Sequence, residues 1–375
     1  MKCIHLCSDY ANQKIYRELI THLEAVGIEQ FIYIAVRRME DINRNRNDTL
    51  QNAKYHYSYL LKPIDRVLFR RKIKRVFYDL TSSVDVTKYS LVHAHFLYSD
   101  GAVALRLKKK FRIPYIVAVR NTDINYFMKY RPDLRYLARR ILEEANRIIF
   151  ITPKYLDLLM KRVPVSMKKI IKNKSNIVPN GLSDYWLDNC HMPKADQQGP
   201  LRLLYIGAHS RNKNITNLLL ATALLRDEMD VRLTLVGGGG DGEKQLERAL
   251  ASGRYDYVEN LGRIDNLDRL LEIYRGNDVF VMPSFHETFG VVYLEALSQG
   301  LPIIYSRGQG IDGYFEPKSV GEAVDPNDPV DIKKKILSVA GRRSAMSSRC
   351  RSEAGRFKWS RIAETYAGIY KRAME

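Results

Sequence analysis

Short apolar runs alternate with longer segments that mix apolar and polar residues along the whole chain. In the first half, these runs occupy residues 2–7, 31–36, 91–95, 114–119 and 147–152. The pattern begins again in the second half, where the runs occupy residues 201–207, 231–237, 278–283 and 301–305. Uninterrupted apolar runs of this length are typical of strands in parallel sheets that are covered by helices on both faces. The pattern therefore predicts an α/β protein with two doubly wound parallel sheets.

A polar, proline-bearing segment separates the two halves. Residues 187–200, LDNCHMPKADQQGP, predict a linker by composition. The chain has 375 residues, more than one hydrophobic core usually serves. We therefore expect one Rossmann-like domain over residues 1–186 and a second over residues 201–356. Residues 357–375 predict an amphipathic helix that crosses back to the first domain.

Charge distinguishes the two halves more sharply than the apolar pattern does. The net charge of the chain is +19. Residues 1–185 hold 35 Lys and Arg against 17 Asp and Glu, whereas residues 186–375 hold 26 against 25. A basic first half indicates an anionic partner for that half alone, such as nucleic acid, a phospholipid surface or a phosphorylated substrate.

The cysteines and the apolar content bear on the cellular location of the protein. The four cysteines lack metal-ligand spacing, and Cys3 and Cys7 fall in the first predicted strand, so we expect them to be buried reduced thiols. The first residues lack the apolar stretch of a signal peptide, and no run of eighteen apolar residues occurs. These observations predict a cytoplasmic protein that is soluble or peripheral on a membrane.

The segment HETFGVVYLEALSQG, residues 286–300, is the clearest candidate for chemistry. It follows the predicted strand 278–283, and a helix can begin near Gly290, which also lets a ligand approach the backbone. The free amides and the dipole at a helix start stabilise a phosphate. Glu287 and Glu295 on either side of such a site suit neutral hydroxyls. The alternative interpretation is that Glu287 only stabilises the helix electrostatically and that Glu295 is a surface glutamate.

The stretch PSFHETFGVVYLEALSQGLPII, residues 283–304, resembles the E-x7-E signature of glycosyltransferase family 4. Its members are retaining, nucleotide-sugar-dependent enzymes of the GT-B fold, in which two Rossmann-like domains face each other across a cleft. Further matches occur in the right order: VHAHF (92–96), NIVPNGL (176–182), LYIGAHSRNKN (204–214), LVGGGG (235–240) and ENLGRI (259–264). The resemblance covers essentially the whole chain.

This resemblance implies a donor site in the second domain. Glu295 would hold the ribose hydroxyls and Glu287 a hydroxyl of the donor sugar. The backbone amides of Phe289, Gly290 and Val291 would hold the diphosphate.

The resemblance also implies where the leaving diphosphate meets positive charge. Lys213 stands six residues after Gly207, which ends the first strand of the second domain, and Arg211 lies between them. No Asp-x-Asp pair occurs in the loops expected at the cleft, so we expect Lys213 and Arg211 to do what a metal would otherwise do. Arg263 is a candidate contact to the base. We expect no metal and no cofactor besides the nucleoside-diphosphate sugar.

Two positions depart from the family pattern. Arg120 stands where the family usually has a histidine after a strand of the first domain, and Ala208 stands where it often has an arginine. Arginine cannot act as a base, because it stays protonated. A retaining front-face mechanism, in which the departing phosphate takes the acceptor proton, needs no base there. We therefore expect Arg120 to act in binding of the sugar or the acceptor.

Two other motifs indicate different chemistry. GGGGDG, residues 237–242, formally matches the dinucleotide-binding pattern G-x-G-x-x-G, but the family resemblance expects a glycine-rich turn at the same place. His93 and His95 alternate along a strand and could bind a metal. Without a third ligand, we interpret them as structural.

Together these features predict a hexosyltransferase that acts on a glycan or a lipid-linked acceptor in cell-surface polysaccharide synthesis. The segment DRVLFRRKIKRVF, residues 65–77, places basic residues beside an apolar stripe, which suits an anionic membrane surface at the inner face of the membrane. The alternative is a non-catalytic or nucleic-acid-binding protein that keeps the fold. The sequence names neither the sugar, nor the base, nor the acceptor.

Overall fold

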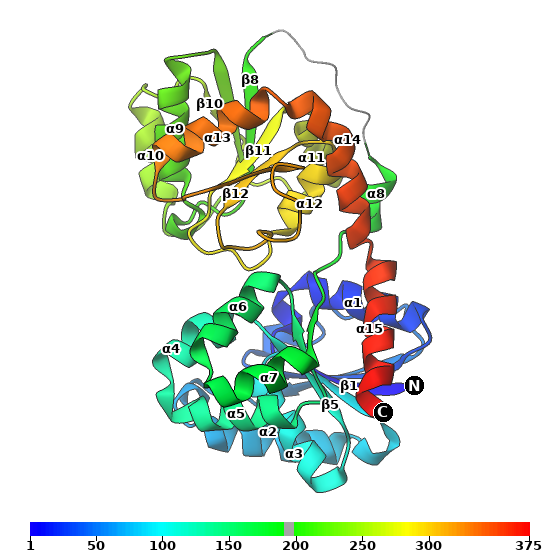
Figure 1. The fold of residues 1–375 in the computed structure, drawn as a ribbon. Coiled ribbons are helices and arrows are strands. Elements are labelled where there is room, and N and C mark those ends of the chain that lie inside the picture. The colour runs from blue at the N-terminus through cyan, green and yellow to red at the C-terminus, as the bar shows by residue number, and fades with distance from the viewer. Residues whose placement is uncertain (191–198) are drawn as a thin grey trace. The chain divides into compact units, whose positions relative to one another are not determined.

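The computed structural model describes residues 1–190 and 199–375 and divides them into two units (Figure 1). Unit 1 comprises residues Met1–Gly181 and Trp359–Glu375, and unit 2 comprises Leu182–Lys358. Of the predicted linker, residues 191–198 lie outside the described residues, and its first residues belong to helix α8 (Asp184–Asp188).

Unit 1 contains a seven-stranded parallel sheet. In spatial order its strands are β3 (Ala53–Tyr59), β2 (Glu29–Val36), β1 (Lys2–Leu6), β4 (Leu91–Ala94), β5 (Tyr115–Val119), β6 (Arg147–Phe150) and β7 (Ser175–Ile177). The order reverses between β1 and β4. Loops diverge at such a point, which is where doubly wound sheets bind their ligands.

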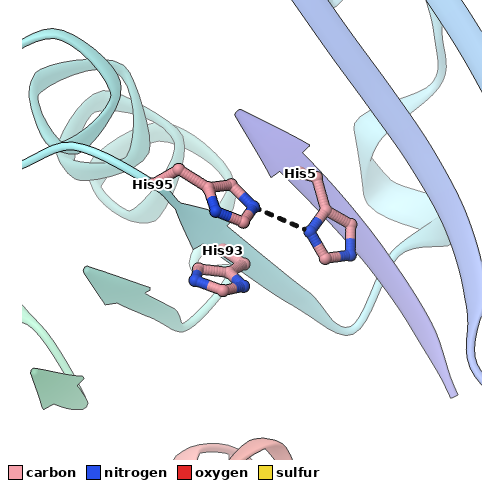
Figure 2. Close-up of side chains that lie close together, drawn as sticks. All are labelled: His5, His93 and His95. Atoms are coloured by element: carbon pink, nitrogen blue, oxygen red, sulfur yellow. Dashed lines mark hydrogen bonds between the residues drawn. The ribbon is translucent and has the colours of Figure 1, made fainter. Parts of the chain in front are cut away.

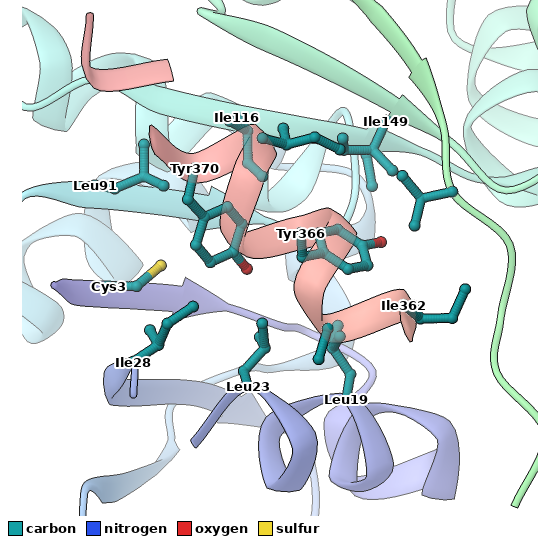
Figure 3. Close-up of a cluster of buried hydrophobic side chains, with 14 of the residues drawn as sticks. Cys3, Leu19, Leu23, Ile28, Leu91, Ile116, Ile149, Ile362, Tyr366 and Tyr370 are labelled. Atoms are coloured by element: carbon teal, nitrogen blue, oxygen red, sulfur yellow. The ribbon is translucent and has the colours of Figure 1, made fainter. Parts of the chain in front are cut away.

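The main helices of unit 1 are α1 (Lys14–Ala25), α2 (Phe69–Ser83), α3 (Ser99–Phe111), α5 (Arg135–Glu144), α6 (Pro153–Arg162), α7 (Val165–Lys174) and α15 (Trp359–Met374), with the short α4 (Met128–Tyr130). Helix α15 confirms the predicted C-terminal helix. Figure 3 shows its apolar side among side chains of α1 and of the sheet. Tyr366 and Tyr370 are buried there beside Leu19, Leu91 and Ile116. The last helix of the chain therefore completes the core of unit 1.

Unit 2 contains a six-stranded parallel sheet. In spatial order its strands are β10 (Val258–Asn260), β9 (Val231–Val236), β8 (Leu201–Ile206), β11 (Val279–Met282), β12 (Ile303–Ser306) and β13 (Gly321–Val324). Its remaining helices are α9 (Ile215–Arg226), α10 (Glu243–Ala251), α11 (Leu267–Gly276), α12 (Val291–Ser298), α13 (Pro329–Ala340) and α14 (Arg343–Ala354). The order reverses between β8 and β11, the counterpart of the reversal in unit 1.

Two parallel sheets with Rossmann-like topology confirm the predicted fold class. All nine predicted strands are present, whereas β3, β7, β10 and β13 were not predicted. Cys3 and Cys7 are buried and free, as expected. Among the described residues, no helix is both long and apolar enough to cross a bilayer.

The charge asymmetry is sharper in the structure than in the two halves of the sequence. Counted over its residues, unit 1 holds 38 Lys and Arg against 18 Asp and Glu, a net charge of +20. Unit 2 holds 23 against 24, a net charge of −1. The whole excess of positive charge therefore belongs to unit 1.

Candidate functional site

Two loops meet at the reversal point of the unit 2 sheet. The first, residues 207–214, follows β8, and the second, residues 283–290, follows the neighbouring β11. Asn212 joins them, because its side-chain amide donates to the His286 carbonyl at 2.8 Å and its side-chain oxygen accepts from the His286 amide at 3.1 Å. Asn214 donates to the Pro283 carbonyl at 2.9 Å. These asparagines were missed in the sequence, although an asparagine before a predicted helix is a signal for the left-handed backbone that Asn214 adopts (φ 60°).

Lys213 and Glu287 face each other across this pair of loops. The Lys213 Nζ lies 2.6 Å from a carboxylate oxygen of Glu287, whose exposed fraction is 9%. The other carboxylate oxygen accepts the backbone amide of Thr288 at 3.0 Å, and the Glu287 carbonyl accepts the amide of Gly310 at 3.0 Å. The carboxylate is thus held in one orientation beside a cation, which a surface residue with only an electrostatic role would not require.

Gly290 begins helix α12 with a left-handed backbone. Its φ is +81°, and a Cβ at this position would lie 2.5 Å from the ring of Tyr293. Only glycine meets both conditions without strain. The following amides, including that of Val291, are the first of the helix and have no partner inside it. Phe289, which is 2% exposed, anchors the preceding turn in the core.

Glu295 lies in the second turn of α12. The Tyr274 hydroxyl donates to one of its carboxylate oxygens at 2.8 Å. Burial raises the pKa of Glu295 to about 7, and the hydrogen bond from Tyr274 opposes the shift. The second oxygen accepts no hydrogen bond from the described residues, so it can accept one from a ligand hydroxyl. Tyr274 gave no signal in the sequence, because its helix lies outside every motif.

The remaining predicted donor residues differ in how firmly they are held. Gly207 directly follows β8 and donates its amide to the Val236 carbonyl at 2.9 Å. The Arg211 side chain is exposed and has no partner among residues 1–190 and 199–375, whereas its amide donates to Asp241 at 2.9 Å. Arg263 is exposed and pairs with Asp265 at 3.0 Å. Arg211 is therefore available to a ligand, while Arg263 would first have to leave Asp265.

The glycine-rich motif 237–242 has a packing role. A Cβ on Gly237 (φ +131°) would lie 1.9 Å from the Gly207 carbonyl oxygen, and one on Gly242 would lie 2.8 Å from the His209 carbonyl oxygen. The Gly242 amide donates to that same carbonyl at 3.0 Å. Gly237 and Gly242 let this turn lie directly against the loop after β8, which accounts for these two glycines without a dinucleotide.

Arg120 follows β5 in unit 1 and is 7% exposed. Its Nε donates to the His95 carbonyl at 3.3 Å, and its guanidinium lies 5.8 Å from the centre of the Tyr16 ring. The carboxylate of Asp123 accepts the Arg120 amide at 2.9 Å. Arg120 is thus a fixed, buried cation of unit 1.

Three histidines meet at the reversal point of the unit 1 sheet, so the interpretation that His93 and His95 lack a third partner was wrong. Figure 2 shows His5 of β1 beside both of them, with His5 Nδ1 and His95 Nε2 joined by a hydrogen bond of 3.1 Å. His93 Nδ1 pairs with the Tyr370 hydroxyl at 2.7 Å. Sequence reasoning missed His5 because it lies 88 residues before His93.

The geometry of this histidine cluster favours a neutral hydrogen-bonded network. The rings of His93 and His95 stack with their centres 3.9 Å apart, and each of the three histidines makes one of the hydrogen bonds given above. Burial lowers the pKa of His5 to about 3 and holds the pKa values of the other two well below their usual range. The cluster is the one group of metal-binding side chains found among the described residues, and its hydrogen bond between His5 and His95 already uses one nitrogen of each ring.

Comparisons with known proteins agree with this geometry. Residues 191–355 match the family described as "Glycosyl transferases group 1", and residues 13–183 match "Glycosyltransferase Family 4". The chain is 26% identical over 309 residues to the D-inositol 3-phosphate glycosyltransferase of Geodermatophilus obscurus, covering 76% of this chain and 67% of that protein.

Solved structures show the same fold. Sucrose-phosphate synthase from Thermosynechococcus elongatus superposes with a TM-score of 0.76 at 20% identity, over 99% of this chain and 98% of the other. The Anabaena protein HepE in complex with UDP superposes with a TM-score of 0.72 at 14% identity, over 98% of this chain and 99% of the other.

Proposed function

The chain belongs to the glycosyltransferases of group 1 and family 4, and we propose that it moves a hexose from a nucleoside-diphosphate sugar to a glycan or lipid-linked acceptor with retention of configuration. The observation that carries the proposal is the pairing of Lys213 with Glu287 beside the first turn of α12. The cation of Lys213, the fixed carboxylate of Glu287 and the free amides at the start of α12 therefore belong to one site. Their chemistry matches a diphosphate next to a sugar hydroxyl.

In this proposal the amides of Phe289, Gly290 and Val291 hold the diphosphate. Lys213 and Arg211 stabilise the negative charge that grows on it as the glycosidic bond breaks. Glu287 accepts a hydrogen bond from a hydroxyl of the sugar, and the reaction needs no metal. The departing phosphate takes the proton of the acceptor, so Arg120 contributes binding rather than proton transfer.

Glu295 and the loop after β10 hold the nucleoside. The free carboxylate oxygen of Glu295 accepts from a ribose hydroxyl, and Arg263 is a candidate contact to the base. The UDP bound to HepE supports a uridine nucleotide as the first donor to test. Structures of the same protein with UDP and glucose and with UDP-glucose make glucose the first sugar to test.

The first experiment screens UDP, GDP and ADP hexoses for thermal protection and for slow donor hydrolysis, with and without EDTA. We expect one base to protect the protein and hydrolysis to persist in EDTA. Lys213→Ala should lower kcat more than it changes KM, because its charge acts on the transition state. Lys244→Ala, an exposed lysine of α10, serves as the matched control. Protection by none of these nucleotides would refute the proposal.

A second proposal concerns the membrane. On α2, Arg70, Arg71 and Lys74 are exposed, and Val67 and Leu68 just before them are 70% and 41% exposed. Basic residues beside exposed apolar ones bind anionic bilayers, at about 1 kcal/mol for each cation near the surface. We infer that unit 1 docks on the inner face of a membrane in cell-surface polysaccharide synthesis.

The structure shows which basic residues of α2 can be replaced to test this docking. Arg75 of α2 donates to the buried Asp65 at 3.2 Å and to the Leu60 carbonyl, so replacing it would damage the fold. The triple variant of Arg70, Arg71 and Lys74 to Glu should lose salt-sensitive binding to anionic vesicles and keep donor hydrolysis. Tighter binding of the parent protein to RNA than to such vesicles would favour the nucleic-acid alternative.

A further inference from the structure

Unit 1 contains a cavity of about 730 Å³ at the carboxyl ends of its central strands. Its wall comes from the segments that follow five strands: Ser8 after β1, Arg37 after β2, Lys72 after β3, Phe96 after β4 and Thr122 after β5. The cavity lies entirely within unit 1. It therefore has no residue in common with the donor site.

Basic side chains outnumber acidic ones in the lining of this cavity by five to four. Five of them line it: Arg37, Arg38, Arg44, Lys72 and Arg131. Aromatic side chains form much of the rest of the wall, among them Phe69, Phe96, Tyr126 and Phe127. The lining thus combines several cations with flat apolar surfaces.

The acidic residues that line the cavity are already engaged. Asp123 accepts the backbone amides of Leu97 and Tyr98 at 3.1 and 3.3 Å, besides that of Arg120. Asp65 accepts from Arg75 at 3.2 Å and from the Lys62 amide at 2.7 Å. Asp9 accepts from the side-chain amides of the following turn, and Asp41 pairs with Arg44 at 3.5 Å. These carboxylates serve the protein's own groups, and of the four only Asp65 is close enough to raise the pKa of the buried Lys72 described next.

Lys72 is the most buried of the five cations. It lies on α2 and is 8% exposed, and its Nζ donates to the Ser99 hydroxyl at 2.8 Å. An ammonium has three N–H donors, so two remain for other acceptors. Burial lowers the pKa of Lys72 to about 8, the negative charge of Asp100 opposes this shift, and the nearby Arg37 adds to it. A buried cation with unused donors is costly unless an anion compensates it.

We propose that this cavity binds the phosphate or diphosphate group of the acceptor, with Lys72 as its deepest contact and the arginines around it. A phosphate offers three strong acceptor oxygens, which matches several cations better than a single carboxylate would. The aromatic wall suits the sugar or lipid part that carries the phosphate. That the bound phosphate belongs to the acceptor rests on the proposed glycosyltransferase function, whereas the binding of an anion depends on unit 1 alone.

Calorimetric titration of the full-length protein with inorganic pyrophosphate, at constant ionic strength, tests the anion site. The titrations use a Lys213→Ala background, because the proposed donor site would also take pyrophosphate. Lys72→Met should weaken binding at least tenfold, and Arg44→Ala, at an exposed position, should weaken it a few-fold. Lys74→Met is the matched control, since it removes an exposed lysine from the same helix, and its affinity should stay within about twofold. Equal affinities for Lys72→Met and Lys74→Met would overturn the proposal.

Two further probes distinguish the sources of the phosphate. Lys72-dependent binding of glucose 1-phosphate would identify a soluble phosphate ester. Lys72-dependent binding of vesicles with polyprenyl phosphate, beyond that of phosphatidylglycerol vesicles of equal charge, would identify a lipid-linked one. Either result supports the proposal. If neither glucose 1-phosphate nor polyprenyl phosphate binds in a way that depends on Lys72, the proposal is overturned.

The same variants separate this inference from the proposed function. If Lys72→Met binds pyrophosphate normally while the protein hydrolyses a nucleotide sugar, the anion site is wrong and the function stands. If Lys72-dependent binding is found but no nucleotide protects the protein, the anion site stands and the function is wrong.

Discussion

The two units share one topology, but the side chains at the point where the strand order reverses are charged in unit 2 and neutral in unit 1. Where the unit 2 sheet reverses, Lys213 and Glu287 form a charged pair between the loops that follow β8 and β11. Where the unit 1 sheet reverses, His5, His93 and His95 form a buried neutral network. Unit 2 is close to electroneutral, and unit 1 carries the whole positive excess.

This difference shows that the fold fixes where a ligand binds but not what binds. In unit 2 the reactive groups come from two adjacent loops, so a short motif contains most of the site. In unit 1 the cavity takes its lining from five separate segments, which follow β1, β2, β3, β4 and β5. The proposed donor site is therefore local in the sequence, and the proposed acceptor site is dispersed.

We expect the largest effect from a substitution that breaks the charged pair of unit 2. Glu287→Gln should lower kcat about 10²- to 10³-fold, because the fixed carboxylate that orients the sugar is lost while the neighbouring amides remain. The Kd for the nucleoside diphosphate, measured by calorimetry, should change less than about threefold. Glu316→Gln, at an exposed position of the same unit, is the control. Normal transfer by Glu287→Gln would show that the pairing with Lys213 is structural only.

A second prediction concerns the pH dependence of nucleotide binding in unit 2. Because the pKa of Glu295 is raised to about 7, its carboxylate is charged above pH 7 and becomes protonated below it. Nucleotide affinity should therefore fall as pH drops below 7, by up to about tenfold per pH unit. Glu295→Gln should bind at least several-fold more weakly at pH 8 and lose this dependence. A parallel pH profile for both proteins would remove Glu295 from the nucleotide site.

A third prediction concerns the acid stability of unit 1. His5 has a pKa of about 3 in the folded protein and about 6.5 when unfolded, so the unfolded state binds more protons between these values. The free energy of unfolding should thus decrease as pH falls below 6.5, by up to about 1.4 kcal/mol per pH unit from His5. His5→Phe should reduce this slope, and His286→Gln, at an exposed position of unit 2, should not.

Fluorescence can isolate unit 1 in that measurement. The protein has two tryptophans, Trp186 in unit 2 and Trp359 in unit 1. In a Trp186→Phe background, Trp359 reports the unfolding of unit 1. An unchanged slope for His5→Phe would mean that the histidine network does not control acid stability.

The smallest expected effect is at Arg120, the fixed, buried cation of unit 1. Arg120→His should raise the apparent KM for the acceptor several-fold and lower kcat less, because the residue binds rather than transfers a proton. Initial rates with varied acceptor, at saturating donor, measure the two separately. Unchanged kinetics would instead make Arg120 a structural cation, held by the His95 carbonyl and Tyr16.

The strands in the middle of each sheet could be predicted from the sequence, whereas the strands at the edges could not. All four missed strands, β3, β7, β10 and β13, are the outermost strands of their sheets. An interior strand is buried on both faces and reads as an apolar run. An edge strand such as AKYHYSY in β3 is half exposed and polar, so its sequence resembles a loop.

The same physical reason applies to the candidate sites. Glu287, Gly290 and Lys213 could be predicted because they lie on loops that a local motif describes. Tyr274, His5 and Lys72 could not, since each reaches its site only through the packing of distant elements. Contacts between segments far apart in the chain leave no pattern in either segment alone.

The position of α15 also governs how the protein is made. Unit 2 is one uninterrupted stretch, whereas unit 1 needs the last seventeen residues of the chain to fill its core. During synthesis, unit 2 can fold while unit 1 still lacks a layer of its interior. Tyr370, whose hydroxyl pairs with His93, leaves the ribosome only after the whole of unit 2. A premature stop shortly before Trp359 would therefore spare the donor half and leave the other half with an open core, a direct target for proteases.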